Sequence, residues 1–97
     1  MTQDNLGNAL AALGKRREGA QASQYLQQAV DAYRSALQVY IESAFPTRWT
    51  VVTQNLASVY EDKRDWVDAY KCYEQLLSQD PSNQYLQAKV KELSGKR

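Results

Sequence analysis

The chain has 97 residues, 43% apolar and 24% charged, a composition typical of one small globular domain. Twelve basic and eleven acidic residues leave a formal charge of +1, which excludes a general attraction to nucleic acid or anionic membranes. No apolar run approaches the length of a membrane span. The single cysteine cannot form an internal disulfide, so we expect a reducing, cytoplasmic location.

The first half of the chain predicts two helices joined by a basic loop. The first helix runs from about residue 2 to residue 13 and is ended by Gly14. Residues 15–19, which include a Lys-Arg-Arg run, are expected to form the loop. The second helix covers about residues 20–44, because its apolar residues recur every three or four positions with no internal Gly or Pro.

Two more helices are predicted in the second half. Pro46 suits the first turn of a helix that ends near Asp62. Asp65 is expected to cap the next helix, which ends by Gln79 because Pro81 cannot continue the helical hydrogen bonds.

The last predicted helix acts as a cap on the fold. Ser82 is expected to cap its start and Gly95 to close it. Lys91 stands where the earlier helices have a small residue, and a lysine there blocks close approach of a further helix. We therefore expect this helix to face solvent.

Two short motifs recur in the same order along the chain. Residues 5–10 (NLGNAL) align with residues 55–60 (NLASVY), and residues 29–33 (AVDAY) align with residues 69–73 (AYKCY). In each copy a small residue lets two helices come close, and a large residue beside it fills the remaining space. The repeats therefore predict two helical hairpins that pack side by side.

These residues resemble the tetratricopeptide repeat, a helix–turn–helix unit of about 34 residues. Residues 50–83 fit one unit without gaps, with Leu56, Ala57, Tyr60, Ala69, Tyr73 and Pro81 at the family's positions. Residues 1–46 resemble the extended repeats of bacterial and fungal multidomain signalling proteins, and the Asn-Leu-Ala of residues 55–57 resembles kinesin light chain.

The resemblance implies an all-α fold of antiparallel helix hairpins, a fragment of an α-solenoid. It predicts a single domain over residues 1–97, made of an extended repeat (1–46), a standard repeat (50–83) and a capping helix (84–95). The first helix has fewer residues before its motif than the third, which suggests a piece of a longer array.

The residues that catalysis requires are missing from this sequence. The absence of histidine excludes the usual catalytic triads and most zinc sites. Gly14 and Gly19 have the spacing of a phosphate loop, but Ala20 and Gln21 stand where lysine and a hydroxyl are needed. The acidic residues between positions 61 and 68 lack the alternate spacing of a calcium loop. We therefore expect no enzyme activity, no metal and no cofactor.

The family resemblance implies that the first helix of each unit lines a concave groove that binds an extended peptide or partner protein. Asn5 and Asn55 hold the same place in the two copies, and an asparagine can both donate to and accept from a peptide backbone. Alternatively, asparagine there only caps or solvates the helix. The candidate binding residues are the polar ones not needed for packing: Asn5, Asn8, Gln54, Asn55, Ser58 and Lys89.

A second hypothesis is self-association. The first helix leaves Ala9, Leu10 and Leu13 without a preceding unit to cover them, and exposed apolar surface tends to be buried by association. The chain would then stack on copies of itself or exchange its long second helix with them.

Overall fold

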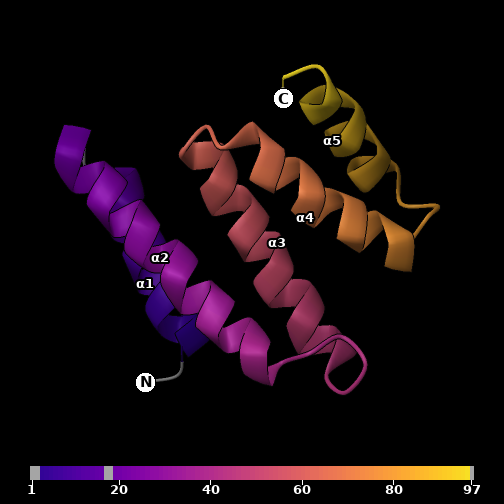
Figure 1. Cartoon of the computed structure of the whole chain (residues 1–97), viewed down its shortest axis with the longest axis horizontal. Helices are drawn as coiled ribbons and strands as arrows, with labels where there is room; N and C mark the ends of the chain where they lie inside the picture. Colours follow the sequence, from indigo (N-terminus) through magenta and orange to yellow (C-terminus); the bar gives the residue numbers. More distant parts are fainter. Residues whose placement is uncertain (1–2, 17–18, 97) are drawn as a thin grey trace.

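The computed structural model describes residues 3–16 and 19–96, and the side chains of residues 6–14 and 21–96. Figure 1 shows helices joined by short connections, and the described ranges contain no strand, which confirms the all-α prediction. The helices are α1 (Gln3–Arg16), α2 (Gly19–Val39), α3 (Pro46–Asp62), α4 (Trp66–Gln79) and α5 (Gln84–Ser94).

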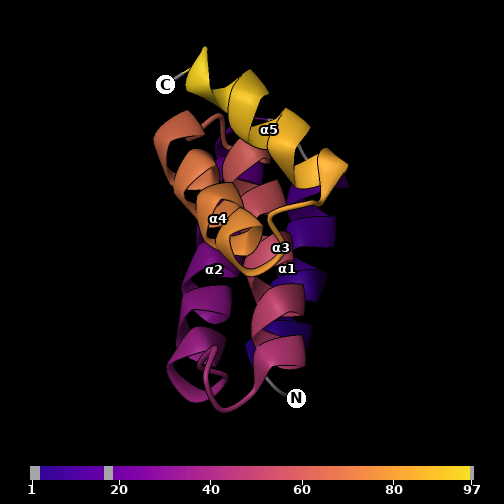
Figure 2. The ribbon, with the colours of Figure 1, turned by 90° about the vertical axis from the view of Figure 1, so that its right-hand side faces the viewer.

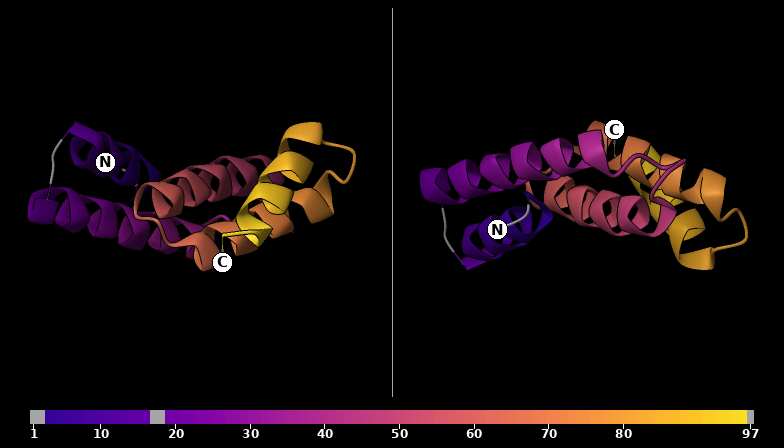
Figure 3. Two further views of the ribbon diagram at one scale, coloured as in Figure 1. Left: turned by 90° about the horizontal axis from the view of Figure 1, so that it is seen from above. Right: turned by 90° about the horizontal axis from the view of Figure 1, so that it is seen from below.

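The helices form two layers. Helices α1 and α2 pack as one hairpin, α3 and α4 as a second, and α5 packs against α4. Figures 2 and 3 show α1, α3 and α5 on one side and α2 and α4 on the other. We refer to the α1–α3–α5 side as the inner face and to the α2–α4 side as the outer face.

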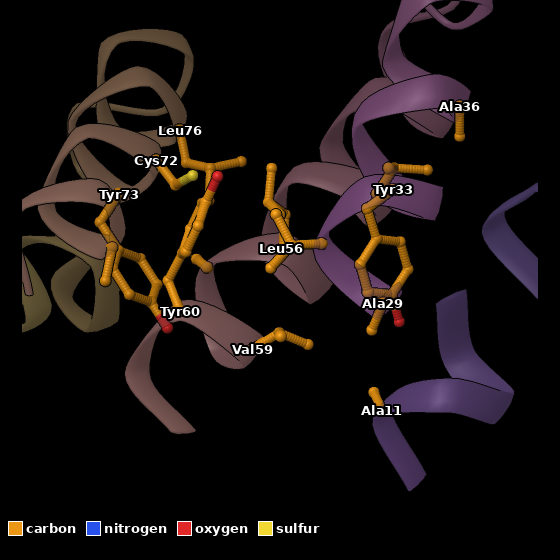
Figure 4. Packing of buried hydrophobic residues seen from close by; sticks show 14 of the residues in the cluster. Ala11, Ala29, Tyr33, Ala36, Leu56, Val59, Tyr60, Cys72, Tyr73 and Leu76 are labelled. Atoms are coloured by element: carbon orange, nitrogen blue, oxygen red, sulfur yellow. The ribbon is translucent and has the colours of Figure 1, made fainter. Parts of the chain in front are cut away.

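Small residues let the helices of each hairpin approach closely. Ala29, Ala57 and Ala69 are completely buried, and they belong to the same core cluster as the buried rings of Tyr33 and Tyr73. Figure 4 shows Ala29 next to the ring of Tyr33. Burying each such ring stabilises the fold by about 1.5–3 kcal/mol. The predicted nesting of small and large side chains is therefore confirmed for these positions.

Gly7 makes the tightest of these approaches. A Cβ atom at this position would lie 2.7 Å from Cε1 of Tyr33, which is closer than non-bonded carbon atoms approach in proteins. Its neighbour Leu6 is 36% exposed, so in the motif of residues 5–10 the large residue before the glycine does not fill the core as the repeat pattern predicted.

Helix α1 continues through Gly14 to Arg16, so the predicted end at Leu13 was wrong. Gly14 is buried, and a Cβ there would lie 2.7 Å from Cδ2 of Leu26. This glycine therefore serves close packing of α1 on α2 and does not end the helix. Of the predicted 15–19 loop, residues 15 and 16 are helical and Gly19 begins α2, while residues 17–18 lie outside the described residues.

Helix α2 ends at Val39, whereas the sequence predicted it to Ala44. The amides of Ala44 and Phe45 both bond to the carbonyl of Ile41, at 3.2 and 2.8 Å, and so form a turn in place of helix. Pro46 disfavours the helical conformation for the residue before it, and Phe45 has φ −134° and ψ 66°. The chain therefore leaves α2 early enough to turn into α3, which covers the predicted residues 46–62.

Two predicted helix caps were wrong in detail. Asp65 stands at the N-cap of α4, but its carboxylate lies 3.1 Å from Nζ of Lys63 and accepts no bond from the helix backbone. Helix α5 is capped by Asn83 and not by Ser82, because the Leu86 amide donates to Oδ1 of Asn83 at 3.1 Å. The predicted C-cap at Gly95 is confirmed.

Replacing Gly7 with alanine should destabilise the fold. The new methyl group must displace the rigid ring of Tyr33, which costs about 1–3 kcal/mol, while the gain in helix propensity returns about 1 kcal/mol. We expect a net loss in the free energy of unfolding, measured by urea denaturation. Gly95→Ala is the matched control, since its Cβ would have 3.6 Å to the nearest atom. Equal stability of Gly7→Ala and the wild type would contradict this packing.

Candidate functional site

The inner face carries a small polar hollow between α1 and α3. Its volume is about 200 Å³ and its floor is formed largely by small side chains. We call it the amide hollow, and it is lined by Asn8, Ala11, Ala12, Tyr33, Asn55, Ser58 and Val59.

Two asparagines meet in the amide hollow. The Nδ2 of Asn55 donates to Oδ1 of Asn8 at 3.2 Å, and the hydroxyl of Tyr33 donates to the same oxygen. These two bonds use both lone pairs of that oxygen and fix the orientation of the Asn8 amide. Neither Nδ2 of Asn8 nor Oδ1 of Asn55 has a hydrogen bond to another described residue. Toward the described residues, a donor on Asn8 and an acceptor on Asn55 therefore remain unused, and both residues line the hollow.

A charged group of side chains follows on the same face. The hydroxyl of Tyr73 donates to Oε1 of Glu61 at 2.5 Å, and Nζ of Lys89 lies 3.0 Å from Oε2 of the same carboxylate. The ammonium also lies 5.9 and 5.8 Å from the ring centroids of Tyr73 and Tyr85. We call these four residues the ionic cluster, and they connect α3, α4 and α5.

The environment of the ionic cluster accounts for the pKa directions of its members. The hydrogen bond to Glu61 raises the pKa of Lys89, which therefore stays protonated. Burial, followed by the bond to Glu61, raises the pKa of Tyr73. The cluster consequently holds a cation against an anion and a neutral phenol.

The structure brings together part of the predicted site. Asn8, Asn55 and Ser58 line the amide hollow, while Lys89 lies in the ionic cluster. Gln54 is exposed on α3 and does not line the hollow. Asn5 belongs to α1, but its side chain falls outside the described residues.

Sequence reasoning missed the polar role of the tyrosines. Tyr33 and Tyr73 were assigned to the core alone, yet each hydroxyl reaches the inner face and bonds to a side chain on the first helix of its own hairpin. The sequence did contain an indication of this role, because both repeat copies have tyrosine at a position where phenylalanine would fill the same volume. A buried tyrosine usually has a partner for its hydroxyl.

The other candidate chemistry can be placed in the structure. Asp65 is engaged by Lys63, and the described residues contain no group of three His, Cys, Asp or Glu side chains able to hold a metal ion. Cys72 is buried, and burial raises the pKa of its thiol to about 12. At neutral pH this thiol is protonated and a poor nucleophile.

Residues 53–85 match the family model of the tetratricopeptide repeat. This segment contains most of α3, all of α4 and the start of α5. The chain carries a tetratricopeptide repeat. No curated protein and no solved structure gives a significant match to the chain.

The matched segment overlaps the unit that the sequence predicted at residues 50–83. Within it, Ala57, Ala69 and Tyr73 are buried between the two helices of the repeat. Tetratricopeptide repeats are in general modules for protein–protein interaction. Among the helices as described, none is both long and apolar enough to cross a membrane.

The raised pKa of Cys72 predicts a loss of stability at high pH. The folded chain keeps the thiol proton up to about pH 12, whereas the unfolded chain releases it near pH 9.0. The contribution of this thiol to the free energy of unfolding is therefore complete below pH 9.0. It falls as the pH rises above 9.0, by at most about 1.4 kcal/mol per pH unit.

Urea unfolding at a series of pH values above 9.0 measures this contribution. We expect Cys72→Ala to lose stability less steeply with pH than the wild type, and the non-titrating control Ser78→Ala to follow the wild type. Parallel curves for Cys72→Ala and the wild type would show that the thiol does not titrate differently in the two states.

Proposed function

We propose that the inner face binds an extended segment of a partner protein, with the amide hollow as its central contact. The observation that supports this most directly is the pairing of Asn8 with Asn55, which leaves one donor and one acceptor facing the hollow. A peptide group offers the complementary pair, a carbonyl oxygen and an N–H.

The Tyr33 hydroxyl prepares the site for this contact. Because it donates to Oδ1 of Asn8, it fixes the orientation of that amide, and with it the position of the NH₂ group, before a ligand arrives. Pre-orientation of this kind lowers the entropic cost of binding. The described residues that line the hollow are all uncharged, so this lining favours a neutral stretch of backbone with small side chains.

The remaining predicted residues flank this contact in the proposal. Ser58 lies within the hollow, and Gln54 is exposed on the turn of α3 next to Asn55. Lys89 lies on α5, where the exposed ring of Tyr85 offers a surface for an apolar side chain of the partner. Asn5 is placed on α1 ahead of Asn8.

The proposal assigns the chain a scaffolding role without catalysis. The family is typically non-enzymatic, and the buried, protonated thiol of Cys72 offers no reactive nucleophile. A reducing cytoplasmic location suits that thiol.

Replacing both Asn8 and Asn55 with alanine should reduce partner capture several-fold, since each lost hydrogen bond is worth about 1 kcal/mol. The measurement is a quantitative affinity capture from lysate of the source cells, with the wild type, the double variant and Gln38→Ala compared. Gln38 is an exposed amide on the outer layer and serves as the matched control. Undiminished capture of every partner by the double variant, with its helix content intact, would refute the inner-face site.

Self-association is the second candidate function. Its proposed surface lies between α1 and α2 of the first hairpin. A hollow of about 270 Å³ lies there, lined by Leu6, Leu10, Gln28, Asp31, Ala32 and Ser35. Leu6 is 36% exposed and Leu10 is only partly buried. A second copy that packs on this surface would cover both leucines.

If this surface pairs, the molecular mass measured by light scattering should rise with concentration. Leu6→Glu should abolish the rise because it would bury a charge, whereas Val67→Glu, at an exposed valine on α4, should not. A monomer at every concentration would exclude this second function.

A further inference from the structure

The outer face has a groove of its own, distinct from the amide hollow. Along the described lengths of α2 and α4, no Cα atom of one helix lies within 8 Å of a Cα atom of the other, and residues of α3 line the space between them. The space has a volume of about 370 Å³, larger than the amide hollow. We call it the outer groove, and it is lined by Arg34, Leu37, Leu56, Tyr60, Asp68, Lys71, Cys72 and Gln75.

The floor of the outer groove contains a hydrogen-bond donor without an acceptor. Figure 4 shows that the hydroxyl of Tyr60 points toward Cys72 and Leu76, opposite to the hydroxyls of Tyr33 and Tyr73. Those two bond to Asn8 and Glu61, whereas the Tyr60 hydroxyl has no hydrogen bond to any described residue. Tyr60 as a whole residue is only 8% exposed, but its hydroxyl oxygen is not among the fully buried polar atoms. The hydroxyl therefore opens into the outer groove, where a ligand or water can accept from it.

The Tyr60 hydroxyl is protonated at neutral pH. Burial, with a further contribution from the charge of Asp68, raises the pKa of Tyr60 above its ordinary value of 10.0. The hydroxyl therefore donates and does not act as an anion. An incoming group must supply an acceptor oxygen.

The charged residues that line the outer groove determine which kind of acceptor group it favours in a ligand. Arg34 on α2 and Lys71 on α4 are both exposed, and neither forms an ion pair with a described residue. Asp68 offsets one of these two cations, so the lining keeps a single net positive charge. One carboxylate balances this charge, whereas a phosphate dianion would exceed it.

The apolar walls indicate what carries the carboxylate. Leu37 and Leu56 line the groove beside the sulfur of Cys72, and they would contact the aliphatic part of a ligand. A groove between two helices over a third accepts a further helix, which presents side chains of one face at successive turns.

We propose that the outer groove is a second protein-binding site, which takes a partner helix carrying a leucine and, one turn away, a glutamate. The leucine packs on Leu37, Leu56 and Cys72. The glutamate carboxylate accepts a hydrogen bond from the Tyr60 hydroxyl and lies between Arg34 and Lys71. This site does not depend on the inner-face proposal, because the two faces share none of these residues.

The probe for this site is a blocked, alanine-based helical peptide with one Leu-x-x-x-Glu pair. Its matched control has glutamine in place of the glutamate. Binding to the whole chain is followed by chemical-shift changes of the backbone amides. We expect the glutamate peptide to bind about tenfold more tightly than the glutamine peptide, with the changes gathered around Arg34, Leu37 and Lys71.

Variants of the chain test the assigned roles. Tyr60→Phe keeps the ring but removes the donor, and Arg34→Gln removes a charge at an exposed position, so each should abolish the preference for glutamate. Tyr73→Phe, the matched tyrosine whose hydroxyl faces the other way, should retain it.

Several results would overturn the proposal. One is that the two peptides bind equally well or not detectably. Another is that the preference for the glutamate peptide survives in both Tyr60→Phe and Arg34→Gln. A further one is that the chemical-shift changes are centred on the amide hollow or on Leu6. The last would assign the helix to the inner face or to the self-association surface. Loss of binding in the Asn8 and Asn55 double variant would likewise place the peptide in the amide hollow.

Discussion

The close approach of paired helices at glycine and alanine positions governs the rest of this structure. At Gly7 the backbone of α1 comes so near to α2 that no Cβ fits beside the ring of Tyr33, and Ala57 and Ala69 bring α3 and α4 together in the same way. Because the backbones are close, a tyrosine ring is long enough to pass between the helices. Its hydroxyl then emerges on the far side, so one side chain serves the core and a surface together.

Much of this arrangement could be predicted from residue spacing. The repeated small and large positions indicated two hairpins, and Pro46 and Gly95 marked helix boundaries that the structure confirms. The errors share a cause. Gly14 and residues 40–45 were interpreted from local preference, but a neighbouring helix or a following proline decides their conformation. Such tertiary influences are not visible in a local pattern.

The candidate site was harder to predict than the fold. Helical periodicity places Asn8, Asn55 and Ser58 on the right faces, but it does not say that Asn8 on α1 meets Asn55 on α3 across two hairpins. The repeat alignment paired Asn55 with Asn5, since it compares equivalent positions and not neighbouring ones. Which asparagine of α1 meets Asn55 depends on the offset between the two hairpins, and that offset follows from the packing of whole side chains.

The arrangement around α3 also determines the angle between the two hairpins. Helix α3 contacts α1 and α2 of the first hairpin and α4 of its own, whereas α2 and α4 do not approach each other closely. The side chains that α3 places against the first hairpin therefore set the curvature of the molecule. A partner bound in the outer groove would lie directly on the helix that defines this curvature.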